Sequence, residues 1–284
     1  MRDVKELKKF AVEIRKETMK CIGNLGVGHV GGALSIVDLL AVLYGGEMNI
    51  DPSDPGKDDR DFLVVSKGHS GPAVYAALAL KGYFPLEMLN TLNRPGTRLP
   101  SHCDMNRTPG IDMTTGSLGQ GASSAMGIAC ANRLKGYDNY TYLILGDGEI
   151  EEGQVWEAAI FANAKKLSRV IAFVDYNKCQ IDDYVENLCA LGDVAEKFRS
   201  FGWYACDVED GNDVEQIAEA IKKAKSQGEK PSAVILHTVK GKGFSRTEGA
   251  LSSHNMPVSR EMTEEALAEL EEQLCRIEEQ EGKE

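Results

Sequence analysis

The sequence contains, at positions 140–149, the segment Tyr140-Thr141-Tyr142-Leu143-Ile144-Leu145-Gly146-Asp147-Gly148-Glu149, in which an apolar run ends in a polar, glycine-rich turn. A second apolar run, residues 169–174, leads into Asp175-Tyr176-Asn177-Lys178-Cys179. Residues 151–166 lie between the two runs and follow a helical pattern. Two strands joined by one helix over this length predict a parallel βαβ unit, which needs roughly 30 residues.

The two strand ends should bring Asp147 and Asn177 close together. In a parallel sheet with a right-handed crossover, the carboxyl ends of neighbouring strands share one edge, where open α/β sheets place their ligands. Carboxylate and amide oxygens suit Mg²⁺, and Gly146 and Gly148 let the backbone approach a bulky anion. We therefore expect a metal and diphosphate site rather than a nicotinamide site. Gly-Asp-Gly alone is also ordinary turn chemistry, and Asn177 alone could form an Asx turn or cap a helix.

Strand and helix patterns alternate along most of the chain. This alternation predicts one α/β domain over residues 1–260, with a single parallel sheet and helices on both faces, followed by a charged C-terminal helix and tail over residues 261–284. Ser35 is expected to cap a helix over residues 34–43, and residues 93–113 to form a long surface loop. Further strands are expected at 62–65, 204–208 and 233–239, and helices at 4–25, 72–81, 122–134, 194–201, 214–225 and 262–280.

Composition limits the possible partners and location. The 284 residues are 42% hydrophobic and carry a net charge of −12, so a sizeable core is available while nucleic acid and anionic lipid are poor partners. An anionic cofactor would need a bridging cation. No run of about 18 apolar residues could span a membrane, and the charged N-terminus does not resemble a signal peptide. Seven cysteines without a Cys-x-x-Cys pair indicate reduced thiols in a cytoplasmic protein and no zinc site.

Five histidines are the candidate acid–base groups. Four of them lie in predicted loops beside Gly or Ser, where functional residues concentrate: His29, His69, His102 and His254. His237 falls inside the strand predicted at 233–239 and is assigned to structure. A single loop histidine is more often a surface or packed imidazole, so these four indicate a site only if the fold gathers them near Asp147.

Five motifs, in order along the chain, resemble those of transketolases. Gly28-His29-Val30-Gly31-Gly32 is similar to the first histidine loop of that family, Ser66-Lys67-Gly68-His69 to the second, and Pro100-Ser101-His102 to the third. Residues 114–121, Thr-Thr-Gly-Ser-Leu-Gly-Gln-Gly, are close to the family signature Thr-Thr-Gly-Pro-Leu-Gly-Gln-Gly. Gly146-Asp147-Gly148 through Asn177 matches the thiamine diphosphate motif. The resemblance runs from about residue 5 to about residue 257 and covers the first, pyrophosphate-binding domain of a full-length enzyme.

The resemblance implies a role for each matching residue. Magnesium would be held by Asp147, Asn177 and the backbone carbonyl of Cys179. The catalytic groups around the substrate would be His29, His69, His102 and His254. Glu152 and Glu157 would face the subunit interface, although glutamate is also favoured in an exposed first helical turn. Contacts to thiamine diphosphate would come from His69, Gly116, Ser117, Leu118, Gly146, Asp147, Gly148, Glu149, Asn177, Ile181 and His254.

The resemblance also implies an activity and a partner. The chain would have the thiamine-diphosphate-binding fold and be the N-terminal subunit of a split transketolase, which transfers a two-carbon ketol unit from a ketose, expected to be a ketose phosphate, to an aldose using Mg²⁺ and thiamine diphosphate. Because the family takes a catalytic Glu from a second domain, we expect a C-terminal partner subunit, and with it an α2β2 heterotetramer. Three alternatives stay open: the alpha subunit of a thiamine-dependent 2-oxo-acid dehydrogenase, a ketol transferase for a sulfonated or branched sugar, and a non-enzymatic cofactor-binding remnant.

Overall fold

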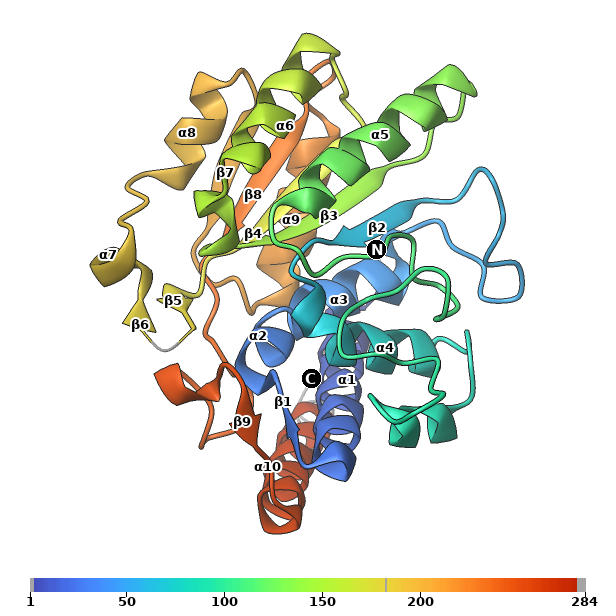
Figure 1. Cartoon of the computed structure of the whole chain (residues 1–284), viewed down its shortest axis with the longest axis vertical. Coiled ribbons are helices and arrows are strands. Elements are labelled where there is room, and N and C mark those ends of the chain that lie inside the picture. The colour runs from blue at the N-terminus through green and yellow to red at the C-terminus, as the bar shows by residue number, and fades with distance from the viewer. Residues whose placement is uncertain (1–2, 182, 280–284) are drawn as a thin grey trace.

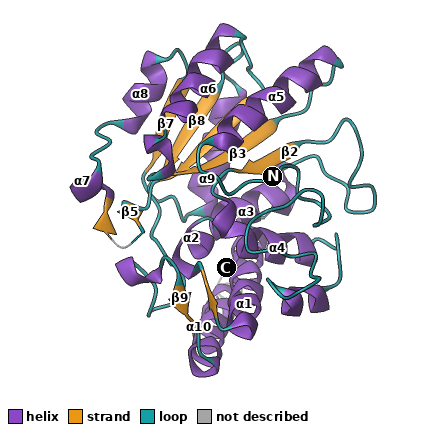
Figure 2. Cartoon of the chain, in the orientation of Figure 1, coloured by secondary structure: helices purple, strands orange, loops and turns teal. Residues whose placement is uncertain are grey.

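A computed structural model describes residues 3–181 and 183–279 of the chain. Its centre is a five-stranded sheet in which every neighbouring pair is parallel, with the order β2-β3-β4-β8-β7 (Figures 1 and 2). The predicted parallel α/β domain is therefore confirmed. The strands are β2 (Phe62–Val65), β3 (Thr141–Gly146), β4 (Val170–Asp175), β7 (Tyr204–Val208) and β8 (Ser232–Leu236).

Helices cover both faces of the sheet (Figure 1). Alternate residues of β3 point to opposite faces, so Tyr142 and Ile144 enter one apolar cluster while Leu143 and Leu145 enter the other. The first cluster is built with α1 (Val4–Leu25), α2 (Val30–Ser35), α3 (Val37–Val42), α4 (Gly71–Leu80) and α9 (Val214–Lys225). The second is built with α5 (Gln120–Leu134), α6 (Gly153–Ala164) and α8 (Val194–Ser200).

Short strands and helical turns connect the main elements. A hairpin of β5 (Cys179–Gln180) and β6 (Asp183–Tyr184) leads into α7 (Val185–Leu188), and β1 (Val27–Gly28) pairs antiparallel with β9 (Met256–Pro257). The helical turns are η1 (Leu43–Glu47, π), η2 (Gly68–Ser70), η3 (Leu86–Thr91), η4 (Glu149–Glu151) and η5 (Leu251–Ser253). Residues 92–119, all of them described, form no helix or strand, as expected for the long loop.

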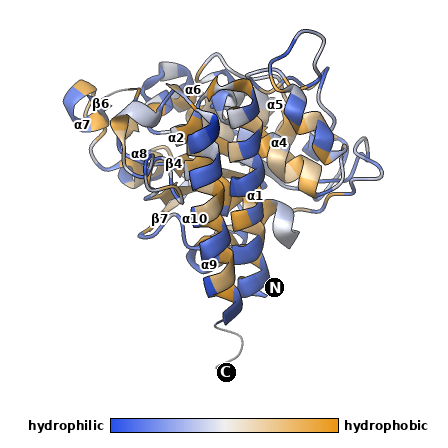
Figure 3. Cartoon of the chain, turned by 90° about the horizontal axis from the view of Figure 1, so that it is seen from below, coloured by the Kyte–Doolittle hydropathy of each residue, from blue (hydrophilic) through white to orange (hydrophobic). Residues whose placement is uncertain are grey.

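The last helix, α10 (Arg260–Glu279), packs along α1 (Figure 3). Lys16 Nζ of α1 lies 2.9 Å from a carboxylate oxygen of Glu271. Gly23 permits the close approach, because a Cβ there would lie 2.1 Å from Thr263 Oγ1. The predicted end of this helix at Gln280 lies outside the described residues. In the part of the chain that the structure describes, none of the helices is both long and apolar enough to cross a bilayer.

Two local predictions are wrong. The helix expected over 34–43 is divided, because α2 ends at Ser35 and α3 begins at Val37. Ser35 does not cap a helix; its buried hydroxyl donates to Gly32 O at 3.1 Å and to the Asp175 carboxylate at 2.6 Å. The strand expected over 233–239 ends at Leu236, so His237 follows it and contacts Asp207 at 2.9 Å.

Candidate active site at the carboxyl edge of the sheet

The carboxyl ends of β2, β3 and β4 border a cavity of about 290 Å³. Most of the residues singled out from the sequence line it: His29, His69, His102, Gly116, Leu118, Gly146, Asp147, Gly148, Glu149, Asn177, Cys179, Ile181 and His254. Ser117, Glu152 and Glu157 do not line it and are exposed. The predicted convergence of strand ends and loops is therefore present in the fold.

Asp147 and Asn177 reach the cavity from adjacent strand ends. Gly146 pairs with Asp175 in the parallel register, and Asp147 N donates to Asp175 O at 3.2 Å. The Asp147 carboxylate accepts hydrogen bonds from Gly148 N at 2.9 Å and Lys178 N at 2.6 Å. Burial and the neighbouring Asp175 carboxylate raise the pKa of Asp147 to about 7. A cation in the cavity would favour the ionised form of this carboxylate.

Four histidines from separate segments meet at the cavity. His29 precedes α2, His69 lies in η2, His102 lies in the long loop and His254 follows η5. The His29 ring centroid lies 5.2 Å from that of His69, 5.9 Å from that of His102 and 5.3 Å from that of His254. Burial and nearby Lys67 lower the pKa of His69 to about 2, and burial with His102 lowers that of His29. At neutral pH both rings are neutral and can each donate one hydrogen bond.

Glycines set the shape of the cavity wall at two positions. Gly116 has φ 146°, and a Cβ there would lie 3.0 Å from the His102 ring. At Gly148 a Cβ would lie 2.7 Å from the Gln180 side chain. Larger residues would therefore displace the groups that line the cavity.

Glu149 joins three segments beneath the cavity. Its buried carboxylate accepts hydrogen bonds from Ser66 Oγ, from Gly119 N at 2.9 Å and from Gly146 N at 3.0 Å. Burial raises the pKa of Glu149. These contacts tie the end of β2 and the start of α5 to the turn after β3. They give Glu149 a bracing role, and its predicted contact with a cofactor stays a prediction.

Two buried lysines in the cavity were missed by sequence reasoning. Lys67 Nζ lies 2.5 Å from the Asp175 carboxylate, and both side chains are almost fully buried. Lys240 Nζ donates to Ile181 O at 2.7 Å and to Leu251 O at 3.3 Å. Both lysines stand in Lys-Gly pairs that closely follow a strand, at 67–68 and 240–241, and that placement was a usable signal. They add positive charge to a chain that is acidic as a whole.

The donor set fits a hard cation together with an oxygen-rich anion. Among the described residues no group of three or more His, Cys, Asp and Glu side chains is arranged around a metal. A site with one carboxylate, the Asn177 amide and a backbone carbonyl needs no such group and leaves coordination positions for ligand oxygens. Gln180 Oε1 is buried against the cavity and has no hydrogen-bond partner in the described part of the chain. Buried polar atoms are normally paired, so this oxygen also fits a ligand or water in the cavity.

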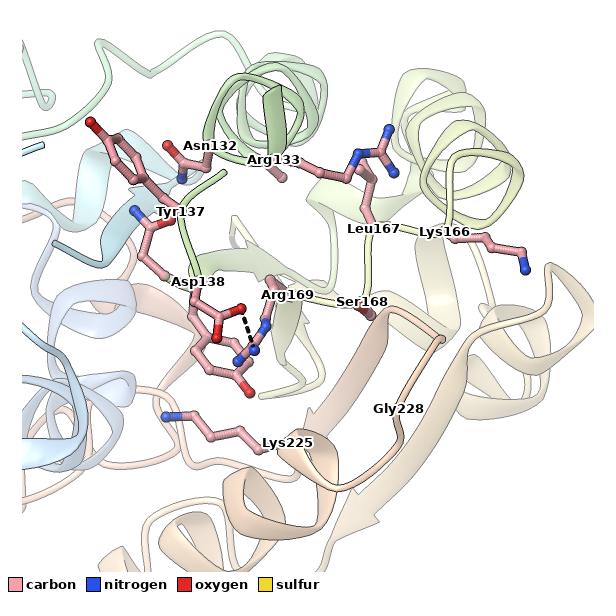
Figure 4. Close-up of a pocket in the computed structure, with 13 residues that line it drawn as sticks. Asn132, Arg133, Tyr137, Asp138, Lys166, Leu167, Ser168, Arg169, Lys225 and Gly228 are labelled. Carbon is pink, nitrogen blue, oxygen red and sulfur yellow. Dashed lines mark hydrogen bonds and ion pairs between the residues drawn. The ribbon is translucent and has the colours of Figure 1, made fainter. Parts of the chain in front are cut away.

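A second cavity, of about 430 Å³, lies at the opposite, amino edge of the sheet (Figure 4). Two of its cations lie over the Tyr140 ring, with Lys225 Nζ at 4.4 Å and Arg169 Cζ at 4.8 Å from the ring centroid. Lys166 points away from them, and Arg169 also pairs with Asp138 at 2.6 Å. Lys166 pairs with Glu229 at 3.1 Å, with both side chains mostly exposed. The histidines and strand-end ligands are absent from its lining. We therefore take the cavity at the carboxyl edge as the candidate active site.

Comparisons with known proteins show what the chain is similar to. Residues 7–274 match the family described as "Transketolase, thiamine diphosphate binding domain". The chain is 56% identical over 266 residues to the 6-deoxy-6-sulfo-D-fructose transketolase subunit SqwG of Clostridium sp. (strain MSTE9), covering 94% of this chain and 96% of that protein. It is 35% identical over 264 residues to one subunit of the apulose-4-phosphate transketolase of Phocaeicola vulgatus, with 93% of each covered.

Solved structures give the same result for the fold. The transketolase from Campylobacter jejuni superposes with a TM-score of 0.88 at 28% identity, over 97% of this chain and 46% of that one. The transketolase from Leishmania mexicana superposes with a TM-score of 0.86 at 28% identity, over 99% and 46%. The chain thus spans less than half the length of these solved enzymes and nearly the whole length of the subunit relatives.

Proposed function

The chain belongs to the transketolase family, and we propose that it is the N-terminal subunit of a split transketolase that is active only with a C-terminal partner subunit. One observation carries the proposal: the four histidines, Asp147 and Asn177 share a cavity in a chain that covers 96% of one transketolase subunit but 46% of a single-chain transketolase. We propose that a second polypeptide supplies the remainder of the active site.

Thiamine diphosphate and Mg²⁺ are the cofactors of this subunit. When bound, thiamine diphosphate supplies the carbanion chemistry by which a carbon–carbon bond is broken and a new one formed. We assign the metal to Asp147, Asn177 and the backbone carbonyl of Cys179. The Gly148 amide with His69 and His254 would hold the diphosphate, while Gly116, Ser117, Leu118 and Ile181 would contact the rings of the cofactor. The position of these residues, Ser117 excepted, in the lining of one cavity supports these assignments.

The histidine cluster would orient and polarise the sugar. A neutral imidazole donates one hydrogen bond. His29 and His69 can therefore each place an N–H toward a substrate oxygen without carrying a positive charge. His102 and His254 lie at the same cavity and would bind the neighbouring hydroxyls. Holding the donor carbonyl and hydroxyls in one geometry is the main contribution that such groups make to ketol transfer.

The partner would carry the pyrimidine-binding domain, and the assembly would be α2β2. Glu152 and Glu157 are exposed at the start and in the first half of α6, where we propose that they face another subunit. The same helix exposes Ile160 and Phe161, at 53% and 41% of their surface. Exposed large apolar side chains such as these support a contact with another subunit. A cytoplasmic location remains a prediction.

The donor is proposed to be a ketose with a sulfonate group in place of phosphate. The support is the 56% identity to a subunit named for 6-deoxy-6-sulfo-D-fructose, against 35% to one named for apulose 4-phosphate. This narrower proposal about the donor stands separately from the proposal of ketol transfer itself.

The test is to produce this chain alone and together with the C-terminal subunit that co-purifies with it. Ketol transfer to an aldose should be negligible for the single chain and appear for the pair in the presence of thiamine diphosphate and Mg²⁺. Strong activity of the single chain would contradict the split arrangement. Turnover of 2-oxo acids instead of ketoses would favour the dehydrogenase alternative, and a preference for a phosphorylated over a sulfonated ketose would remove only the narrower proposal.

A further inference from the structure

Asp175 receives hydrogen bonds from four side chains at the end of β4. One carboxylate oxygen, Oδ2, accepts from Lys67 Nζ at 2.5 Å, Ser35 Oγ at 2.6 Å and Asn177 Nδ2 at 3.0 Å. The other oxygen, Oδ1, accepts from Thr238 Oγ1. Asp175 is 1% exposed and Lys67 is 2% exposed, so the pair is removed from water. Isolated buried charges are costly, and each of these two ions depends on the other.

The contact with Asn177 determines which way its amide points. A carboxylate only accepts hydrogen bonds, so the group that faces Asp175 must be the NH₂ group of Asn177. The amide oxygen, Oδ1, then lies on the opposite side, where it accepts from Cys179 N at 3.1 Å. One lone pair of Oδ1 remains for a ligand in the cavity that Asn177 lines.

Lys67 connects this carboxylate to the histidine loops. Its ammonium also donates to Gly32 O at 2.9 Å, and Ser70 Oγ donates to the same carbonyl at 2.8 Å. Gly32 lies against His69, since a Cβ there would be 3.2 Å from the His69 ring nitrogen Nε2. One buried ammonium thus joins the ends of β2 and β4 to the segment that follows His29.

We propose that Asp175 and Lys67 are positioning residues for the metal: Asp175 holds the Asn177 amide with its oxygen toward the cavity, and Lys67 holds the Asp175 carboxylate in place. This inference rests on the proposed function, because it takes Asn177 as a ligand of Mg²⁺. Outer groups that orient metal ligands typically contribute about 10-fold to 100-fold in metal affinity.

The test titrates Mg²⁺ into the two-chain enzyme at saturating thiamine diphosphate and follows binding by intrinsic fluorescence. The double variant Lys67→Met/Asp175→Leu replaces the ion pair by apolar side chains without leaving a lone buried charge, so the fold should survive. Its Kd for Mg²⁺ should rise about 10-fold to 100-fold. Wild-type affinity in a folded double variant would overturn the proposal. Absence of Mg²⁺ binding by the wild-type pair would instead count against the proposed function.

A double-mutant cycle separates positioning from general damage. If Asp175 acts through Asn177, the pair replacement should have little further effect in an Asn177→Ala background, whereas additive losses would overturn the proposal. Thr18→Val is the matched control, because Thr18 is also buried but its hydroxyl donates to Ile14 O within α1, away from the cavity lining, so the Mg²⁺ affinity should equal that of the wild type. If the double variant does not fold, hydrogen exchange of the Asn177 side-chain amide in the wild-type protein decides, with one protected proton expected and rapid exchange of both contradicting the proposal.

Discussion

The two edges of the parallel sheet each carry a cavity, and the two cavities are lined in different ways. At the carboxyl edge, Lys67 and Asp175 are buried, and backbone amides converge on Asp147. At the amino edge, Arg169 and Lys166 extend from the surface and pair with exposed carboxylates. The amino-edge cavity is the larger, at about 430 Å³ against about 290 Å³. Volume and cation content therefore do not identify the active site of this chain.

The difference follows from the cost of removing charge from water. An exposed ion pair contributes little and needs no neighbours, so it arises readily on any helical surface. A buried ion must be paired and hydrogen-bonded, so several segments of the chain must place their partner groups around it. Only the carboxyl edge meets that requirement, with the ends of β2, β3 and β4 and the histidine loops all contributing. Four predictions can break or sharpen this contrast.

The largest effect is expected for Asp147→Ala. Removing the only carboxylate proposed to hold Mg²⁺ should reduce Mg²⁺-dependent retention of thiamine diphosphate by the two-chain enzyme more than about 100-fold, because an outer ligand alone already accounts for about 10-fold to 100-fold. Cofactor content after gel filtration, with and without a chelator, measures it. Asp138→Ala at the amino edge is the control and should retain the cofactor. Unchanged retention in Asp147→Ala would remove this residue from the metal.

The next effect concerns the histidine cluster. His69→Ala should lower the kcat for ketol transfer of the assembled enzyme about 100-fold to 1,000-fold, as expected for loss of an oriented donor to a developing charge. His237→Ala is a suitable control, since His237 lies outside the cavity and contacts the exposed Asp207. Steady-state kinetics of both variants measure the contrast. Equal activity of the two would mean that the cluster at the carboxyl edge is not catalytic.

Sequence reasoning found the parts of the site that depend on short-range pattern. A strand followed by Gly-Asp-Gly and a second strand followed by Asn177 are local features, and parallel topology brings their ends together without further information. Long-range partners could not be found in this way. Lys67 lies 108 positions from Asp175 in the sequence, and Ser35 lies 140 positions from it. Ser35, which the sequence predicts as a helix cap, therefore donates a hydrogen bond to a distant buried carboxylate instead. Sequence separation of this kind leaves no periodic signal.

Acid should destabilise the carboxyl edge through His69. Its pKa is lowered from 6.5 to about 2 by burial and by Lys67, so below pH 6.5 the unfolded chain takes up a proton that the folded chain does not. The stabilising contribution of the neutral ring is therefore complete above pH 6.5 and decreases as the pH falls. Between about pH 7.5 and about pH 5.5 the loss should be about 1.4 kcal/mol. Denaturant unfolding of the wild type and of His69→Gln at both pH values isolates the contribution of His69 to the free energy of unfolding. An identical pH dependence of the two proteins would contradict the lowered pKa of His69.

The smallest effect is expected at the amino edge, for Lys166→Gln and Arg169→Gln. Both changes break ion pairs whose carboxylates are more than four-fifths exposed, at 82% for Glu229 and 91% for Asp138. Such pairs contribute about 0–1 kcal/mol, so each variant should unfold within about 0.5 kcal/mol of the wild type and retain its cofactor. Arg169 also stacks over the Tyr140 ring at 4.8 Å, which makes it the more sensitive of the two. A loss of cofactor from either variant would show that the amino edge contributes to the site, and the contrast between the two edges would then fail.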